Sequence, residues 1–248
     1  MTSFAIHRAR LSDLMQFIRT RYPDWRNSIY YPRCREYPFT INALRLTGKE
    51  RLLDIGCKVS ILPNYISSLG CEVTGIDLDE TAITRTKHFH ATSSDSTLNF
   101  LCMDATCLDF PSDYFDRVCS VGVFEHMDAD KDMLAATEVG RVLRKGGIAV
   151  LTVEATNDPR KPEWFRCYDE VALRARLVEP SGLQLVELGF FADPAWFPFR
   201  QLTERKWFNY WLAPIRPLLS FFFFRQQRDY EAVADTIGAV GYVVMRKR

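Results

Sequence analysis

Residues 51–80 read RLLDIGCKVSILPNYISSLGCEVTGIDLDE, and this stretch decides the fold. Its two short apolar runs, 51–55 and 71–76, are predicted to be strands. Between them, apolar residues recur at the spacing of one helical face (Leu62, Tyr65, Ile66 and Leu69). A strand, a helix and a strand in this order predict a βαβ unit of a parallel sheet.

The alternation of strands and helices continues along the chain. Further strands are expected at 97–103, 115–121, 148–153, 183–189 and about 238–246. Helices are expected at 12–21, 36–46, 79–90 and 169–179, and another before residue 148, closed by Gly146 and Gly147. The pattern predicts an α/β fold with helices on both faces of the sheet. We divide the chain into an N-terminal helical cap at 1–50, a core at 51–194, an insertion at 195–236 and a last core strand at 237–248.

The composition is that of a folded domain with a substantial core. The chain has 248 residues, of which 47% are hydrophobic and 25% charged. Seven cysteines without a CxxC pair are typical of reduced thiols, so we expect a cytoplasmic protein. The N-terminus lacks the apolar segment of a signal peptide, and no apolar run is long enough to span a membrane.

The charge is unevenly distributed along the chain. Residues 1–50 hold nine Lys and Arg against four Asp and Glu, and residues 195–248 have the same balance. The segment between them holds fourteen basic residues against twenty-three acidic ones. Basic flanks around an acidic centre suggest that the flanks meet something anionic. No Lys/Arg-rich run or nucleic-acid motif is present, so nucleic acid is not an expected partner.

Polar residues follow four successive predicted strands, at the edge where open α/β sheets bind ligands. Gly56 permits a tight turn, and the helix beyond it offers free N–H groups. An acid that ends the second strand suits ribose hydroxyls, and one after the third can accept a hydrogen bond from an exocyclic amine. The expected binding residues are Asp54, Gly56, Cys57, Lys58, Asp77, Leu78, Asp104, Ala105, Ser120 and Val121.

These strand ends resemble the motif series of class I S-adenosylmethionine (SAM)-dependent methyltransferases. The matching stretches are RLLDIGC, VTGIDLD, FLCMDA, FDRVCSVGVFEHM and LRKGGIAVLTV, and they are most similar to the ubiquinone-type small-molecule branch. The resemblance covers about 51–153 and implies a Rossmann-like, mostly parallel sheet of seven strands with an antiparallel last strand. It places Asp54 and Gly56 beside the methionine moiety, Asp77 on the ribose and Asp104 at the adenine amine. Ser120 and Val121 would then line the cofactor near the sulfonium.

The glycine-rich loop departs from the family pattern. Where the family usually has D-x-G-x-G-x-G, this chain has Lys58 and Ser60 at the second and third glycine positions. The loss argues against a dinucleotide, whose pyrophosphate needs the second glycine. SAM has no phosphate, so it tolerates this loop, and Lys58 either pairs with the cofactor carboxylate or is a solvated loop residue. A degenerate site that does not bind SAM is the remaining interpretation.

His126 is the candidate general base, because its free pKa lies near neutrality and it follows the fourth strand. Glu125 precedes it, and a structural role for this Glu-His pair is the alternative. Metal-dependent relatives carry an acid at the position of Gly122, so no metal site is expected. In the family resemblance, the segment before the first strand covers the cofactor and acceptor. Its candidates are Arg33 for an anionic group and Tyr30, Tyr31 and Tyr37 for stacking, against an ordinary packed helix and turn.

Residues 195–225 form an aromatic and basic insertion. They contain eleven of the thirty-three aromatic residues, with five Lys and Arg against one acid. This composition is typical of a segment at a membrane surface, which would act as a lid or platform for a lipid-linked acceptor. The alternative is a helical subdomain that packs on the core or on a twin subunit.

The sequence therefore predicts a SAM-dependent methyltransferase, cytoplasmic or peripheral at a membrane. Its expected acceptor is a small molecule, a glycan or a lipid intermediate, and an oxygen nucleophile is favoured by His126. The alternative is a catalytically degenerate SAM-fold protein that acts as a binding or scaffold module through its insertion.

Overall fold

The computed structural model describes residues 5–22, 29, 32–90, 97–155, 166–192, 218, 225–227 and 239–248. Tyr30 and Tyr31 lie outside these residues, as does nearly all of the 195–225 insertion. In the described part, no helix is long and apolar enough to cross a membrane.

Within the described ranges, eight strands form one sheet in the order β3-β2-β1-β4-β5-β8-β6-β7. The strands are β1 Arg51–Ile55, β2 Glu72–Asp77, β3 Leu98–Cys102, β4 Phe115–Val121, β5 Leu143–Glu154, β6 Gln184–Ala192, β7 Arg225–Gln227 and β8 Val240–Arg246. Strands β1 to β5 pair in parallel, and β8 runs antiparallel between β5 and β6. This confirms the expected seven-stranded sheet with its antiparallel last strand. A three-residue strand, β7, which lies within the expected insertion at 195–236, adds an eighth strand at the edge.

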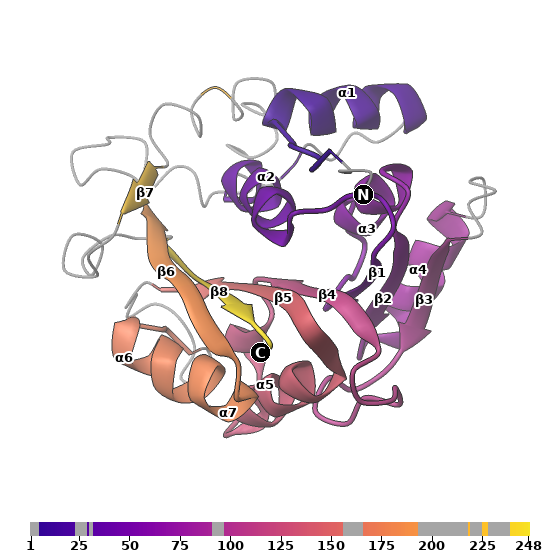
Figure 1. Ribbon diagram of the computed structural model, residues 1–248. Coiled ribbons are helices and arrows are strands. Elements are labelled where there is room, and N and C mark those ends of the chain that lie inside the picture. Colours follow the sequence, from indigo (N-terminus) through magenta and orange to yellow (C-terminus); the bar gives the residue numbers. More distant parts are fainter. Residues whose placement is uncertain are drawn as a thin grey trace.

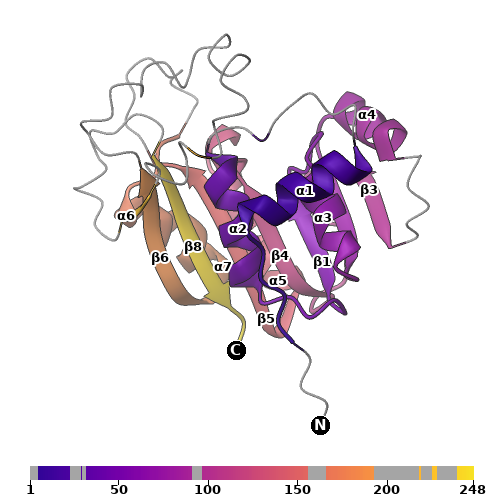
Figure 2. The same cartoon turned by 90° about the horizontal axis from the view of Figure 1, so that it is seen from above.

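Helices cover both faces of the sheet, as expected. They are α1 Leu11–Arg21, α2 Arg33–Leu44, α3 Leu62–Ser68, α4 Glu80–His90, η1 Phe124–His126, α5 Lys131–Val142, α6 Glu170–Ala172, η2 Leu173–Val178 and α7 Glu179–Ser181. Helices α1, α2 and α3 lie on one face and α5, α6 and α7 on the other (Figure 1). Seen from above, α1 and α2 lie across the middle of the sheet (Figure 2). Each face has its own buried apolar cluster.

The end of α5 differs from the expectation. The helix ends at Val142, and the next residue already begins β5, so Gly146 and Gly147 lie within the strand rather than closing the helix. Gly146 has a φ of +76°, and the register between β4 and β5 shifts between Phe115 and Arg117. The glycines therefore serve an irregularity at the start of a strand, which a glycine pair signals as readily as a helix end.

Gly140 marks the contact between α5 and α7. A Cβ at this position would lie 1.9 Å from the carbonyl oxygen of Ser181. We expect Gly140→Ala to lower the free energy of unfolding by about 1–3 kcal/mol, because two backbones must separate. Urea denaturation measures the change. Leu134→Ala on the same helix is the control, since Leu134 is 55% exposed. A Gly140→Ala protein that gained stability from its better helix propensity would contradict the contact.

Candidate functional site

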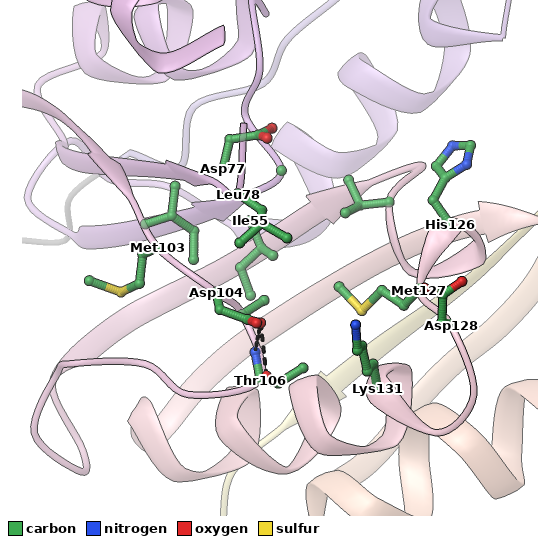
Figure 3. A pocket seen from close by; sticks show the side chains of 14 residues that line it. Ile55, Asp77, Leu78, Met103, Asp104, Thr106, His126, Met127, Asp128 and Lys131 are labelled. Carbon is green, nitrogen blue, oxygen red and sulfur yellow. Dashed lines mark hydrogen bonds between the residues drawn. The ribbon is translucent and has the colours of Figure 1, made fainter. Parts of the chain in front are cut away.

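A cavity of about 240 Å³ lies at the carboxyl ends of the parallel strands (Figure 3). From β1 the sheet continues to β2 and β3 on one side and to β4 and β5 on the other, so the strand order reverses between β1 and β4. Ligands bind open α/β sheets at such a point. The cavity is lined by Ile55, Gly56, Ile76, Asp77, Leu78, Met103, Asp104, Ala105, Thr106, Val123, His126, Met127, Asp128 and Lys131. Six residues predicted from the sequence thus meet at one site, from the ends of β1, β2, β3 and β4.

Gly56 forms the floor where β1 turns toward α3. Its φ is +75°, and its N–H and that of Cys57 both donate to the carbonyl of Ile76, at 2.8 and 2.9 Å. A Cβ on Gly56 would lie 2.3 Å from a methyl carbon of Val123. The close approach of β1 to the β4 loop therefore requires glycine. Lys58, at the position where the family has its second glycine, is exposed and also has a positive φ of +36°.

Asp77 ends β2 and joins two loops at the rim. One carboxylate oxygen accepts from the backbone N–H of Lys58 at 3.0 Å, and the other from that of Asp79 at 2.9 Å. Each oxygen retains a further lone pair for a ligand hydroxyl. Beside it, the apolar side chain of Leu78 is 68% exposed at the edge of the cavity. The exposed Leu78 is suited to the apolar ring of a ligand, and the remaining lone pairs of Asp77 are suited to hydroxyl groups of the same ligand.

Asp104 lies at the opposite end of the cavity from Asp77 (Figure 3). Its Oδ1 accepts from both the backbone N–H and the hydroxyl of Thr106, each at 2.8 Å. These hydrogen bonds, and the nearby Lys131 ammonium, lower the pKa of Asp104. Asp104 is therefore an ionised acceptor at neutral pH, and its Oδ2 is left to face a ligand donor.

Asp54, Ser120 and Val121 lie on β1 and β4, and none of the three lines the cavity. Burial raises the pKa of Asp54 to about 7, although the Cys119 thiol donates to it at 3.4 Å. The Ser120 hydroxyl is buried and donates to the carbonyl of Ile55 at 3.0 Å. In this arrangement Asp54 and Ser120 support the cavity floor from within the sheet.

The N-terminal helix α2 reaches the same strand ends. Its Arg33 guanidinium forms an ion pair with Glu36 and lies against Gly122, where a Cβ would be 2.0 Å from it. Glu36 is fully buried and accepts a 2.6 Å hydrogen bond from Thr152 of β5. Burial disfavours the charged guanidinium, but Glu36, Tyr37 and Glu125 outweigh it and raise the pKa of Arg33. Arg33 therefore balances the charge of the buried Glu36.

Tyr37 and Glu125 adjoin this ion pair. The Tyr37 hydroxyl forms a 3.0 Å hydrogen bond with Ser60, which connects α2 to the loop after β1. Glu125 is buried, and its Oε2 has no hydrogen-bond partner among the residues that the structure describes. Burial raises the pKa of Glu125 to about 8, although the nearby Arg33 opposes the rise. Its neighbour His126 lines the cavity, whereas Glu125 does not.

The raised pKa of Glu125 predicts a pH-dependent stability. The folded protein holds this proton up to about pH 8, whereas an unfolded glutamate releases it near 4.5. Because the folded state then binds more protons, the stabilisation is complete below pH 4.5 and is lost as the pH rises toward 8. As the pH rises across this window, the free energy of unfolding of the isosteric Glu125→Gln variant should therefore increase relative to that of wild type. The increase is at most about 1.4 kcal/mol per pH unit. Urea unfolding from pH 5 to 9 measures it, and a constant difference would contradict it.

Among the described residues, no group of three or more His, Cys, Asp or Glu is arranged to hold a metal ion.

The sequence did not single out Glu36, Thr152 or Lys131. Glu36 and Thr152 are 116 positions apart, and no local pattern links them. Lys131 carries one usable signal, since a cation at the first position of a helix opposes the helix dipole.

Comparisons with known proteins identify the family. Residues 53–151 match the family described as "Methyltransferase domain". An uncharacterized methyltransferase of Schizosaccharomyces pombe is 32% identical over 128 residues, which are 50% of this chain and 86% of that protein. The chain therefore belongs to the class I SAM-dependent methyltransferase family, whose cofactor is S-adenosylmethionine.

Several relatives are ubiquinone biosynthesis O-methyltransferases. The one from Bradyrhizobium diazoefficiens is 33% identical over 94 residues, which are 38% of this chain and 36% of that protein. The chain thus spans about a third of the length of that relative, and 42% of its Mesorhizobium japonicum counterpart.

Solved structures share the fold at low identity. The cyclase SpnF superposes with a TM-score of 0.62 at 19% identity, covering 98% of both chains. A geranyl diphosphate methyltransferase in complex with SAM gives 0.61 at 13% identity, covering 87% of this chain and 86% of that one.

Proposed function

We propose that this protein transfers a methyl group from SAM to a hydroxyl oxygen of a small-molecule acceptor. One observation carries the proposal: Gly56, Asp77, Asp104 and His126, from four different strand ends, line a single cavity. Bound SAM would supply a methyl group on a sulfonium, activated for transfer. The protein then has to hold the cofactor, orient the acceptor and remove the acceptor's proton.

The residues present suit SAM. The free lone pairs of Asp77 would accept from the ribose hydroxyls, and the free Oδ2 of Asp104 from the adenine amine. Leu78 and Ala105 would cover the apolar faces of the base. Glycine at position 56 lets the turn after β1 lie directly against Val123 of the cavity wall, beside the expected path of the methionine moiety. Lys58 stands at a position where the family usually has glycine, but its backbone has a positive φ. Its N–H also donates to Asp77.

His126 is the proposed base, since it is one of the residues that line the cavity. Arg33 bears on the acceptor class. Because Glu36 already balances the charge of Arg33, the guanidinium favours a neutral hydroxyl over a second anion. The names of the ubiquinone relatives point to oxygen as well. Glycan and lipid-linked alcohols share this chemistry and remain alternatives within the proposal.

Transfer of radiolabelled methyl groups from SAM to a panel of phenols, polyols and lipid-linked alcohols tests this function. We expect a phenol or alcohol to be labelled, and His126→Gln to lower the rate about 100-fold or more with unchanged S-adenosylhomocysteine (SAH) affinity. Because the fold alone does not determine the acceptor atom, the panel includes amines and thiols. Labelling of those alone would overturn the oxygen assignment. Absence of both labelling and SAH binding would favour the degenerate binding module.

A further inference from the structure

Lys131 places a positive charge at the N-terminus of a helix, where a cation is unfavourable. It is the first residue of α5, directly after the N-cap residue Asp130. The N-terminus of a helix carries a partial positive charge, so an ammonium there costs stability unless something else requires it. Such local conflicts in natural proteins are found mostly at functional sites.

The acids that flank Lys131 are bound to another partner. Arg176 pairs with Asp130 at 2.9 Å and with Asp132 at 2.7 Å, and the hydroxyl of Tyr168 also donates to Asp132. None of the ion pairs among the described residues includes Lys131. Its ammonium is therefore available to a ligand.

The Lys131 side chain belongs to the cavity wall. It projects from α5 beside Met127, at the end of the cavity that holds Asp104 and Thr106 (Figure 3). It is close enough to Asp104 to contribute to the lowered pKa of that carboxyl. The base-binding end of the cavity thus has an acceptor on β3's loop and a charged donor on α5.

Adenine matches this pair of groups. Its amine is a donor, and the ring nitrogens on either side of that amine, N1 and N7, are acceptors. We propose that Lys131 is a further cofactor-binding residue, which donates to one of these two ring nitrogens while Asp104 accepts from the amine. The inference rests on the proposed SAM site and adds to it a residue that reads the base.

Calorimetric titration with SAH tests the role of Lys131. We expect Lys131→Met to bind SAH about tenfold more weakly than wild type, because a charged hydrogen bond is lost. The variant should melt at the same temperature as wild type or higher, since the unfavourable charge at the helix end is removed. Lys145→Met is the matched control: Lys145 is an exposed lysine at the other end of the sheet and should leave affinity unchanged.

Two SAH analogues identify the contact, one with carbon in place of N7 and one with carbon in place of N1. Wild type should lose affinity for one of them, and Lys131→Met should bind that analogue and SAH equally. The proposal would be overturned if Lys131→Met bound SAH as tightly as wild type. It would also be overturned if wild type and Lys131→Met each lost the same affinity for both analogues. Wild type that binds no SAH would instead remove the proposed function, and this inference with it.

Discussion

Replacing Asp77 with alanine is expected to weaken SAH binding at least about 100-fold, because two charge-assisted hydrogen bonds to the ribose are lost. The same carboxylate also accepts from the backbone of Lys58 and Asp79, so the loops after β1 and β2 would lose their common anchor. Calorimetric titration of the variant with SAH measures the effect.

Glu72→Ala is the matched control for Asp77. Glu72 begins the same strand, at the opposite edge of the sheet, and its side chain is 63% exposed. We expect this variant to bind SAH like wild type. An Asp77→Ala protein that melted normally and retained wild-type affinity would show that the ribose does not lie at the end of β2.

The second large effect is expected from Gly56→Ala. The new Cβ would meet the Val123 side chain at 2.3 Å, at a backbone φ of +75°. Because Val123 belongs to the cavity wall, relief of the clash must reshape the cavity. We expect SAH affinity to fall at least about tenfold, with a loss of about 2–4 kcal/mol in the free energy of unfolding from strain and overpacking together.

Gly146→Ala is the control that separates the effect of backbone strain from that of the clash with Val123. Gly146 has nearly the same φ, +76°, but a Cβ there would meet nothing within 4 Å. The control should therefore show the backbone strain alone, a loss of about 1–2 kcal/mol, with unchanged SAH affinity. Equal losses of stability and unchanged binding in both variants would contradict the role of Gly56 in the cavity.

Much of the fold could be predicted from the sequence because its signals are local. The β1–α3–β2 unit follows from apolar periodicity within residues 51–77, and its structure agrees to within one or two residues. The stretch expected as one helix at 169–179 is instead α6, the π-helix η2 and α7 in succession. Apolar spacing did not reveal the π-helix, because η2 has only six residues and its two buried ones, Leu173 and Leu177, keep the i, i+4 spacing of an α-helical face.

Part of the candidate site could likewise be predicted from the sequence, and part could not. Gly56, Asp77 and Asp104 could be predicted because each follows its own strand, and the sheet brings the strand ends together. The pairing of Arg33 with Glu36, and of Glu36 with Thr152, depends on how α2 lies over β5. The residues of one segment do not reveal such a contact, so the sequence offered Arg33 for an anionic group or as part of a packed helix, without its ion pair to Glu36.

Calorimetric titration of the wild-type protein with SAM tests the central claim most directly. The strand-end cavity predicts saturable binding at one site per chain, with a dissociation constant below about 1 mM. The absence of any binding heat at millimolar SAM and at millimolar SAH would contradict it.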